Sequence, residues 1–226
     1  TVTATLSVTD GVYSTSVSFM FALGSFTVIT LFAENFDGVT APGLPANWTT
    51  AQTGAVPPPS FATTAATANS APNAVFTNGA TSVSTNSLIS PVLSIPTFGT
   101  KAITFAHTLS FESGTRRFDG AVLEISVDGG INFVDITDPS IGGSFVSSGY
   151  TATIDTGFSN PLAGRQSWGG TQPNYSTVSV SLPAGFGGSN IRLRWRAGFD
   201  SSISGGNPNW RIDDITITQN FSVCTT

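Results

Sequence analysis

Apolar and polar residues alternate along most of the chain with a period of two, which is typical of β-strands rather than helices. The longest uncharged apolar stretch, residues 16–33, is long enough for a membrane span. Within it, however, Val17, Phe19 and Phe21 share one parity, Ser16 and Ser18 lie on the other, and a Gly-Ser pair interrupts the run. No Lys or Arg flanks the stretch as an orientation signal. The pattern therefore predicts strands here instead of a membrane helix.

Residues 1–22 are predicted to form a single β-hairpin with one apolar face. Both halves alternate, and Asp10-Gly11 between them is a strong hairpin turn. An isolated hairpin is only marginally stable in water. We therefore expect its apolar face, including the assembly residues Val17, Phe19 and Phe21, to pack on the main domain, on a neighbouring domain or on another copy of the chain.

From about residue 26 onward, short strands alternate with turns that are rich in Gly, Pro, Asn and Ser. This spacing predicts an all-β fold, an antiparallel two-sheet jelly-roll sandwich, with the N-terminal hairpin as an addition. Long surface loops are expected at 50–72 and 138–149. The predicted strands are 26–33, 73–77, 87–94, 102–111, 121–127, 132–136, 150–154, 176–182, 190–198 and 209–218.

Three of these strands show which side chains face inward. The inward sets are Ile103, Phe105, His107, Leu109 and Phe111; Ala121, Leu123, Ile125 and Val127; and Ile191, Leu193, Trp195 and Ala197. The alternate positions of the third strand are Arg192, Arg194 and Arg196, which predicts a basic stripe on one outer face.

The composition narrows the class of protein further. Only 9% of the 226 residues are charged, against about 25% in a typical soluble domain, and there is a single Lys. With a net charge of −5, the chain has no electrostatic surface for DNA or RNA. One Cys excludes an internal disulfide framework and a cysteine-based zinc site. The 17 Phe and 4 Trp supply a substantial core, so we expect an extracellular, folded all-β protein with no membrane span.

The apolar parity changes within the last predicted strand. Trp210 and Ile212 share one parity, Ile215 and Ile217 take the other, and the change falls at Asp213-Asp214. A β-bulge would produce this shift. Two carboxylates between large apolar residues need compensation, and Ca²⁺ with its loose shell of oxygen ligands would provide it.

A second acidic segment, Glu34-Asn35-Phe36-Asp37, follows the first predicted strand of the sandwich. In a jelly roll the first and last strands can be neighbours, so the two acidic segments would meet. The alternative is that Asp213 or Asp214 pairs with Arg211 or another arginine and no metal is bound.

Residues 126–133, SVDGGINF, fit the S-x-D-x-G-x-x-aromatic pattern, which resembles the Asp-box turn of secreted β proteins. Asp128 is expected to accept backbone N–H bonds, the glycines to take positive φ, and Phe133 to cover the turn. We assign this turn a structural role.

The candidates for catalysis are weak. His107, the only histidine, lies on the parity of apolar residues, where a buried neutral imidazole is expected. The chain has no G-x-S-x-G motif, and one histidine cannot form a zinc triad. Glu112 and Glu124 can be paired as glycosidase carboxylates only arbitrarily. The chain is therefore predicted not to be an enzyme.

Aromatic residues in or beside predicted loops are the candidates for ligand binding. Trp48, Trp168 and Tyr175 could stack on sugar rings, with Tyr150 nearby, whereas Trp195 and Trp210 are expected in the core. The alternative is that the loop tryptophans close the edges of the sandwich.

The order of several segments resembles the MAM-like jelly-roll modules of large secreted bacterial proteins, also described as cleaved-adhesin or choice-of-anchor domains. The resemblance covers about 30–219. It is carried by AENFDGV, LPANWT, NSLISPVL, ITFAHTLSFE, FDGAVLEISVDGG, PLAGRQSWGG, VSVSLPAGFGG, IRLRWRAGFD and NWRIDDITI.

This resemblance implies a non-catalytic module that acts in adhesion, carbohydrate contact or assembly. It also implies a structural cation, Ca²⁺ being the candidate, at Glu34 and Asp214, with Asp37 and Asp213 as further ligands. The acidic residue usual at the middle of such a site is missing, because this chain has Asn69-Ser70 there.

The resemblance also predicts the domain organisation: 1–24 as a hairpin left from an Ig-like domain or exchanged between chains, 25–219 as the jelly roll, and 220–226 as a linker. Two functions remain open. The first is an adhesion or structural module at the cell surface, assembling into filaments by strand exchange with other copies or with neighbouring domains. The alternative is a carbohydrate-binding or accessory module of a secreted hydrolase or peptidase, with glycans as partners.

Overall fold

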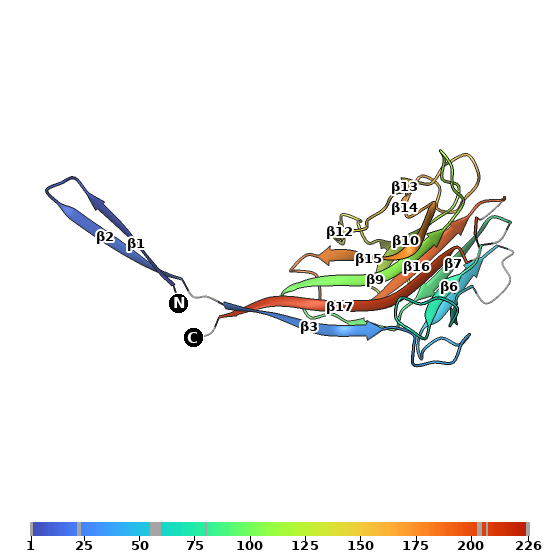
Figure 1. Cartoon of the computed structure of the whole chain (residues 1–226), viewed down its shortest axis with the longest axis horizontal. Coiled ribbons are helices and arrows are strands. Elements are labelled where there is room, and N and C mark those ends of the chain that lie inside the picture. Colours follow the sequence, from blue (N-terminus) through green and yellow to red (C-terminus); the bar gives the residue numbers. More distant parts are fainter. Residues whose placement is uncertain are drawn as a thin grey trace.

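The computed structural model describes residues 2–21, 24–54, 60–79, 81–202, 205–206 and 208–224. Within them the chain is all-β, and its strands form two packed antiparallel sheets and a separate N-terminal hairpin (Figure 1). The described part contains no helix of the length and apolarity that a membrane crossing requires. The predicted fold class, a jelly-roll sandwich with an additional hairpin, is confirmed.

The first sheet has the order β11-β10-β16-β7-β4, with β8 also paired to β16. Its strands are β4 (Thr49–Thr53), β7 (Ser84–Ile89), β8 (Leu93–Ser94), β10 (Gly120–Ser126), β11 (Val134–Asp135) and β16 (Asn190–Phe199).

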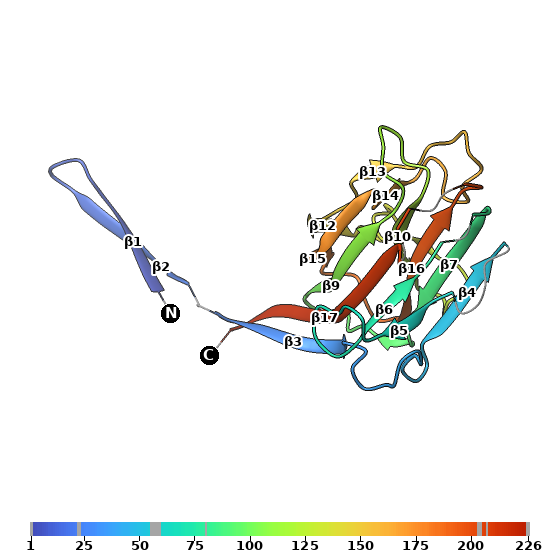
Figure 2. The same cartoon turned by 45° about the vertical axis from the view of Figure 1, so that its right-hand side comes forward.

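The second sheet has the order β12-β15-β9-β17-β6-β5, and β3 also pairs with β17. Its strands are β3 (Gly24–Glu34), β5 (Ala62–Thr64), β6 (Ala74–Thr77), β9 (Thr100–Ser110), β12 (Ser144–Ser147), β15 (Thr171–Leu182) and β17 (Trp210–Cys224). A small sheet of β13 (Ala152–Thr153) and β14 (Gln166–Ser167) is separate in its pairing, but Trp168, directly after β14, forms a bridge with Ala121 of β10. Figure 2 shows the strands of both main sheets from a second direction.

The core lies between the two sheets, and its residues are those that the strand parity predicts. Every predicted inward residue of β9 and β16 is buried, and so are Ala121, Leu123 and Ile125 of β10. Val127 is the exception: it is 49% exposed because β10 ends at Ser126, one residue before it. Alternation therefore predicts a residue's side correctly only while the strand continues.

The predicted loops hold more structure than expected. Most of β4 and all of β5 lie within 50–72, and β12 lies within 138–149. Residues 220–224, expected as part of a linker, continue β17 and pair with β3. Residues 1, 22–23, 55–59 and 225–226, which fall in the predicted hairpin, loop and linker segments, lie outside the described residues. The proposed domain division stays a prediction.

Two ribbons extend the molecule at one end. The first is the hairpin of β1 (Val2–Thr9) and β2 (Ser14–Phe21), which among the described strands pair only with each other. The second is formed by the first part of β3 and the last part of β17, which pair from Val28↔Asn220 to Gly24↔Cys224. This β3–β17 ribbon (residues 24–28 with 220–224) extends beyond the sandwich (Figure 1).

Candidate functional site

The predicted bulge lies where β17 changes partners. Trp210–Ile212 pair with β6, whereas Ile215–Cys224 pair with β3 on the same side of β17. On its other side, the register against β9 shifts between Asp213 and Thr216, and Asp214 has a positive φ of 49°. This backbone places Ile212 and Ile215 both in the core, as their change of parity requires.

The two aspartates at the bulge hold the segment that precedes β6. Asp213 Oδ2 accepts hydrogen bonds from the backbone N–H groups of Asn69 (2.7 Å) and Ser70 (3.0 Å). Asp214 accepts hydrogen bonds from the side chains of the same two residues, each at 2.7 Å. Burial raises the pKa of Asp213 to about 6, although these backbone donors oppose the shift. No ion pair among the described residues joins Arg211 to either aspartate.

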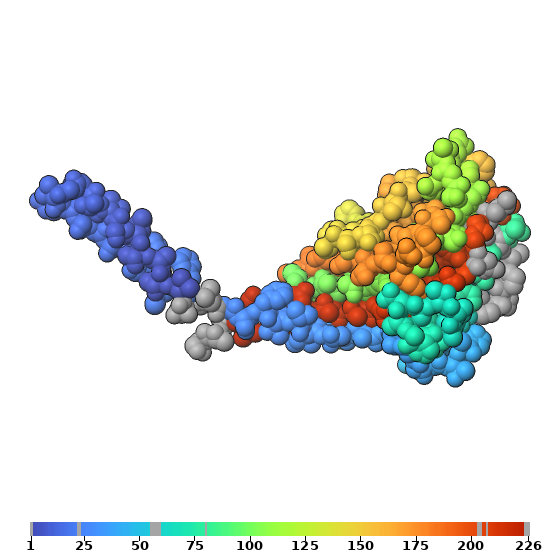
Figure 3. Space-filling model, in the orientation of Figure 1, coloured from blue at the N-terminus to red at the C-terminus, as the bar shows by residue number. Residues whose placement is uncertain are grey.

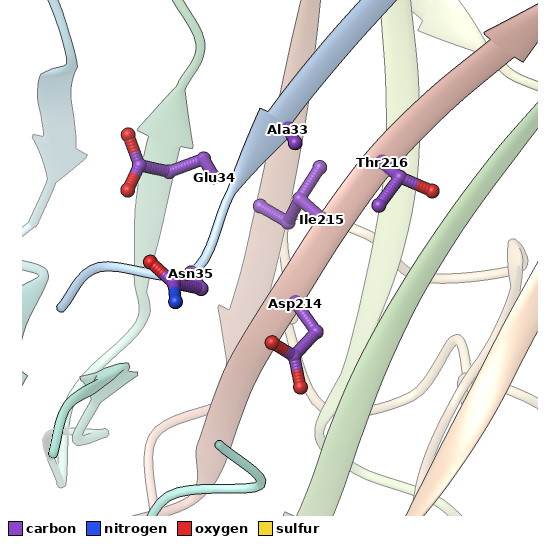
Figure 4. Close-up of a pocket in the computed structure, with 6 residues that line it drawn as sticks. All are labelled: Ala33, Glu34, Asn35, Asp214, Ile215 and Thr216. Carbon is purple, nitrogen blue, oxygen red and sulfur yellow. The ribbon is translucent and has the colours of Figure 1, made fainter. Parts of the chain in front are cut away.

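The first and last strands of the sandwich are neighbours, as the sequence predicted, and Glu34 pairs in register with Ile215. Glu34 and Asp214 line one surface pocket of about 340 Å³, together with Ala33, Asn35, Ile215 and Thr216. Their carboxylates point in different directions (Figure 4).

Glu34 and Asp37 are occupied by local hydrogen bonds. The Glu34 carboxylate accepts the Phe36 N–H (2.8 Å), and Asp37 accepts the Asn73 N–H (2.9 Å) and the Asn35 side chain (2.6 Å). No group of three acidic, histidine or cysteine side chains suited to a metal occurs among the described residues. The Ca²⁺ site at Glu34, Asp37, Asp213 and Asp214 therefore stays a prediction.

The tryptophans expected as a sugar platform lie in the core. Trp168 is 1% exposed and donates its indole N–H to the Ser148 carbonyl (2.8 Å), while Trp48 is 7% exposed and packs against Phe36 and Trp195. A buried ring offers no face to a sugar, so the ligand-binding assignment of Trp48 and Trp168 is corrected: they close the sandwich. Tyr175 is half-buried and donates its hydroxyl to the Thr67 carbonyl (3.1 Å).

His107 is fully buried between the sheets, edge-on to Phe105 and Trp168. Its Nδ1 accepts the indole N–H of Trp210 (3.3 Å), which assigns the proton of the neutral ring to Nε2. Burial lowers the pKa of His107 to about 4, so the imidazole is neutral at physiological pH. A group enclosed in this way does not reach a substrate at the surface.

The outer face of the β10–β16 pair is an ion network. The Glu124 carboxylate, 2% exposed, forms ion pairs with Arg165 and Arg194 and lies 3.8 Å from the Arg196 guanidinium. Arg165 also forms an ion pair with Asp135 at 2.8 Å. The predicted outward arginines of β16 are thus present, but Arg194 and Arg196 share the buried Glu124 carboxylate and are largely covered. Sequence parity predicts the direction of these arginines, whereas the covering segment that brings Arg165 gives no local signal.

The predicted Asp-box turn forms between β10 and β11. Asp128 accepts hydrogen bonds from the Ser126 hydroxyl and from the backbone N–H groups of Ile131 and Asn132. Gly129 and Gly130 have φ values of 81° and 98°. The Arg194 guanidinium carbon lies over the Phe133 ring, 4.1 Å from the ring centre. Phe133 therefore joins the turn to the ion network.

The hairpin has one apolar face, and that face is uncovered. The register pairs Val2 with Phe21, Ala4 with Phe19 and Leu6 with Val17. Every described residue of the hairpin is exposed, and it stands clear of the sandwich (Figure 3). Six apolar side chains on this face are each 48–58% exposed, and we call them the hairpin face: Val2, Leu6, Val8, Val17, Phe19 and Phe21.

The β3–β17 ribbon carries a second exposed apolar surface. Phe26 is 69% and Val28 is 56% exposed, and they share one face of the ribbon with Ser222 and Asn220 opposite them. We call this pair the ribbon face. Apart from Asp10 at the hairpin turn, the described residues of both ribbons are uncharged.

Comparison with known proteins gives structural likeness only. No family model matches the chain, and no curated protein matches it. Similar solved structures include the K1 and K3 cleaved adhesin domains of Lys-gingipain from Porphyromonas gingivalis W83. The K1 domain is 20% identical (84% of this chain, 97% of that chain, TM-score 0.49), and the K3 domain is 19% identical (84% and 100%, TM-score 0.45).

Another is the CBM22-1 xylan-binding domain of Paenibacillus barcinonensis Xyn10C, at 12% identity (92% of this chain, 100% of that chain, TM-score 0.44). Likenesses at these levels transfer no residue role to this chain. Cleaved adhesin domains are thus among the similar structures, while the MAM-like and choice-of-anchor labels stay predictions.

Proposed function

We propose that this chain is a non-catalytic extracellular structural module that assembles with other copies of itself through its N-terminal hairpin. The observation that carries the proposal is the hairpin face, a continuous apolar surface on a ribbon that pairs with no other strand. Single exposed apolar residues are ordinary on a protein surface, whereas a contiguous set on one face marks an interaction site.

The ribbon face supports another copy as the partner. Each molecule then carries both an apolar hairpin and an apolar ribbon, and neither has charges along its strands to repel the other. Because the two surfaces differ, hairpin-to-ribbon contact is heterologous, and such contacts build open chains unless the rotation closes a ring.

The hairpin face is too small for a stable interface formed by that face alone. Eight residues per strand and two strands give a face of roughly 270 Å², against about 800 Å² per partner in a standard stable interface. The outer backbone edges of β1 and β2 have no partners among the described residues. Strand addition at these edges, together with burial of the hairpin face, would enlarge the contact and satisfy the backbone groups.

The test is the mass of the protein in solution as a function of concentration, measured by light scattering. Val17→Glu with Phe19→Glu places two charges on the hairpin face, and we expect this variant to remain a 23.3 kDa monomer where the unmodified chain forms oligomers. The matched control is Ser16→Glu with Ser18→Glu, which places the same charges on the opposite face of the same strand. A monomeric unmodified chain, or equal loss of assembly in both variants, would contradict the proposal.

The alternative function is a carbohydrate-binding or accessory module of a secreted hydrolase or peptidase. One of the three aromatic residues predicted to bind a sugar remains a candidate for it. Trp48 and Trp168 are buried, which leaves Tyr175 as the candidate. A glycan array is its direct test. A specific glycan whose binding is lost in Tyr175→Ala and kept in Trp48→Phe would support this alternative.

A further inference from the structure

Three carboxylates lie at the end of the sandwich where β9 and β16 end and β10 begins. Glu112 follows β9, Asp119 precedes β10 and Asp200 follows β16. The pairs Gly120↔Gly198 and Trp210↔Leu109 place these strand ends side by side, at the far end of β17 from the β3–β17 ribbon (Figure 2). None of the three belongs to the acidic cluster at the bulge.

Asp119 is fully buried and only half satisfied. Its Oδ1 accepts the Asp200 backbone N–H at 2.8 Å, but its Oδ2 is buried and has no hydrogen-bond partner. The Glu112 Oε2 atom is also buried and without a partner. Two enclosed carboxylate oxygens without donors are costly unless a positive charge compensates them.

The surroundings supply negative charge instead of positive. Burial, together with the nearby charges of Asp200 and Glu112, raises the pKa of Asp119 to about 7 against the hydrogen bond from the Asp200 N–H. None of the ion pairs of the described residues includes Glu112, Asp119 or Asp200. The arginine nearest in sequence, Arg117, donates to the carbonyls of Gly114 and Arg116.

The backbone keeps Glu112 beside the loop that follows Asp200. Gly205 has a φ of 94°, and a Cβ there would lie 2.6 Å from the Glu112 nitrogen and 2.5 Å from the Phe111 carbonyl carbon. Only glycine permits this approach. Asp200 is itself fixed by the Ser202 N–H (2.8 Å) and hydroxyl (3.0 Å), so its charge stays at the site while its Oδ1 is already engaged.

From this geometry we propose that Asp119 Oδ2 and Glu112 Oε2 bind a Ca²⁺ ion, with Asp200 contributing negative charge from beside it. No three acidic side chains of the described residues are grouped for a metal, so the shell has two carboxylates and is completed by carbonyl oxygens and water. Ca²⁺ accepts such irregular oxygen shells, whereas Mg²⁺ requires near-ideal octahedral geometry. The ion would tie the two ends of the loop 111–119 together.

The experiment is isothermal titration calorimetry of the full chain, stripped with EDTA and dialysed, against CaCl₂. Extracellular modules bind Ca²⁺ with Kd values of about 10⁻⁴ to 10⁻³ M, which sets the concentration range. We expect Asp119→Asn to bind one Ca²⁺ fewer per chain than the unmodified protein. Asp138→Asn, which alters an exposed turn carboxylate hydrogen-bonded to Ser140, is the control and should bind the same number.

Counting ions separates this site from the predicted one at the bulge, because loss of Asp119 leaves Asp213 and Asp214 intact. Should Asp119→Asn fail to fold, Glu112→Gln serves instead, with affinity at the site reduced at least about tenfold. The proposal is overturned if the unmodified protein binds no Ca²⁺, or if Asp119→Asn binds as many ions as the unmodified protein. If the unmodified protein binds no Ca²⁺ and Asp119→Asn is more stable than it, Asp119 is a carboxyl that is buried in its protonated form.

Discussion

At the scale of single residues, the sandwich buries charged and titratable groups. The free-energy cost of burying each one depends on the groups that pair with it. Glu124 is buried to 2% exposure beneath Arg165, Arg194 and Arg196. Removing one partner of such a network leaves uncompensated charge, which typically costs about 3–5 kcal/mol. We therefore expect Glu124→Gln to lower the free energy of unfolding by about 3 kcal/mol in urea titrations.

The control for Glu124→Gln is Arg116→Gln, which breaks the exposed pair with Asp155 (3.4 Å). It should cost less than about 1 kcal/mol, because solvent screens such pairs. Equal losses in the two variants would contradict the assignment of Glu124 as the centre of the network.

His107 predicts a pH dependence of stability. Its pKa falls from the ordinary 6.5 to about 4 on folding because the ring is buried. Between these values the unfolded chain binds a proton at this residue and the folded chain does not. The stability contributed by the neutral ring is therefore complete above about pH 6.5 and is lost as the pH falls toward 4.

The measurement is the melting temperature of the unmodified chain and of His107→Gln between pH 4 and pH 7.5. The unmodified chain should lose more stability over this range, because glutamine does not titrate. Parallel curves for the two proteins would show that His107 is not a buried neutral imidazole.

At the scale of elements, the bulge in β17 sets which strands meet. It allows one strand to pair with β6 through Trp210–Ile212 and then with β3 through Ile215–Cys224. Asp213 stabilises the junction by accepting the backbone N–H groups of Asn69 and Ser70.

We expect Asp213→Ala to release this segment. The amide protons of Asn69 and Ser70 should then exchange faster with solvent, as measured by hydrogen exchange with NMR detection, while the amide of Leu123 in β10 should not change. Asp138→Ala is the matched control, since it removes a carboxylate that caps only its own exposed turn. Unchanged protection at residues 69 and 70 would contradict this role.

The bulge can be predicted from the sequence, whereas the segment that Asp213 and Asp214 bind, Asn69-Ser70, cannot. The shift of parity from Ile212 to Ile215 is visible in the sequence, because burial of both forces an extra residue into the strand. The Asp-box turn is equally local. The partners Asn69 and Ser70 are some 144 residues away in the chain and have no such signal.

The burial of the loop tryptophans lacks a local signal for the same reason. Whether Trp48 and Trp168 face solvent depends on how distant segments close over them, and a predicted loop does not carry that information. The short strands β4, β5 and β12 form by pairing with longer neighbours, and none shows an alternating apolar pattern of its own.

At the scale of the whole molecule, assembly and the proposed cation site lie at opposite ends of β17. The hairpin and the β3–β17 ribbon extend from the end of β17 at Cys224 (Figure 1), whereas Glu112, Asp119 and Asp200 lie toward its other end, which begins at Trp210. Because no element is shared between the two ends except the long strand, we expect Asp119→Asn to leave self-association unchanged.

The head-to-tail arrangement is tested most directly by mixing two defective variants and measuring mass by light scattering. Val17→Glu with Phe19→Glu lacks a functional hairpin face, and Phe26→Glu with Val28→Glu lacks a functional ribbon face. Each variant alone is predicted to be monomeric, and their mixture to form a one-to-one dimer that grows no further, since only one intact hairpin and one intact ribbon face remain to meet. A mixture that stays monomeric, or a Phe26→Glu with Val28→Glu variant that still forms oligomers alone, would contradict the account.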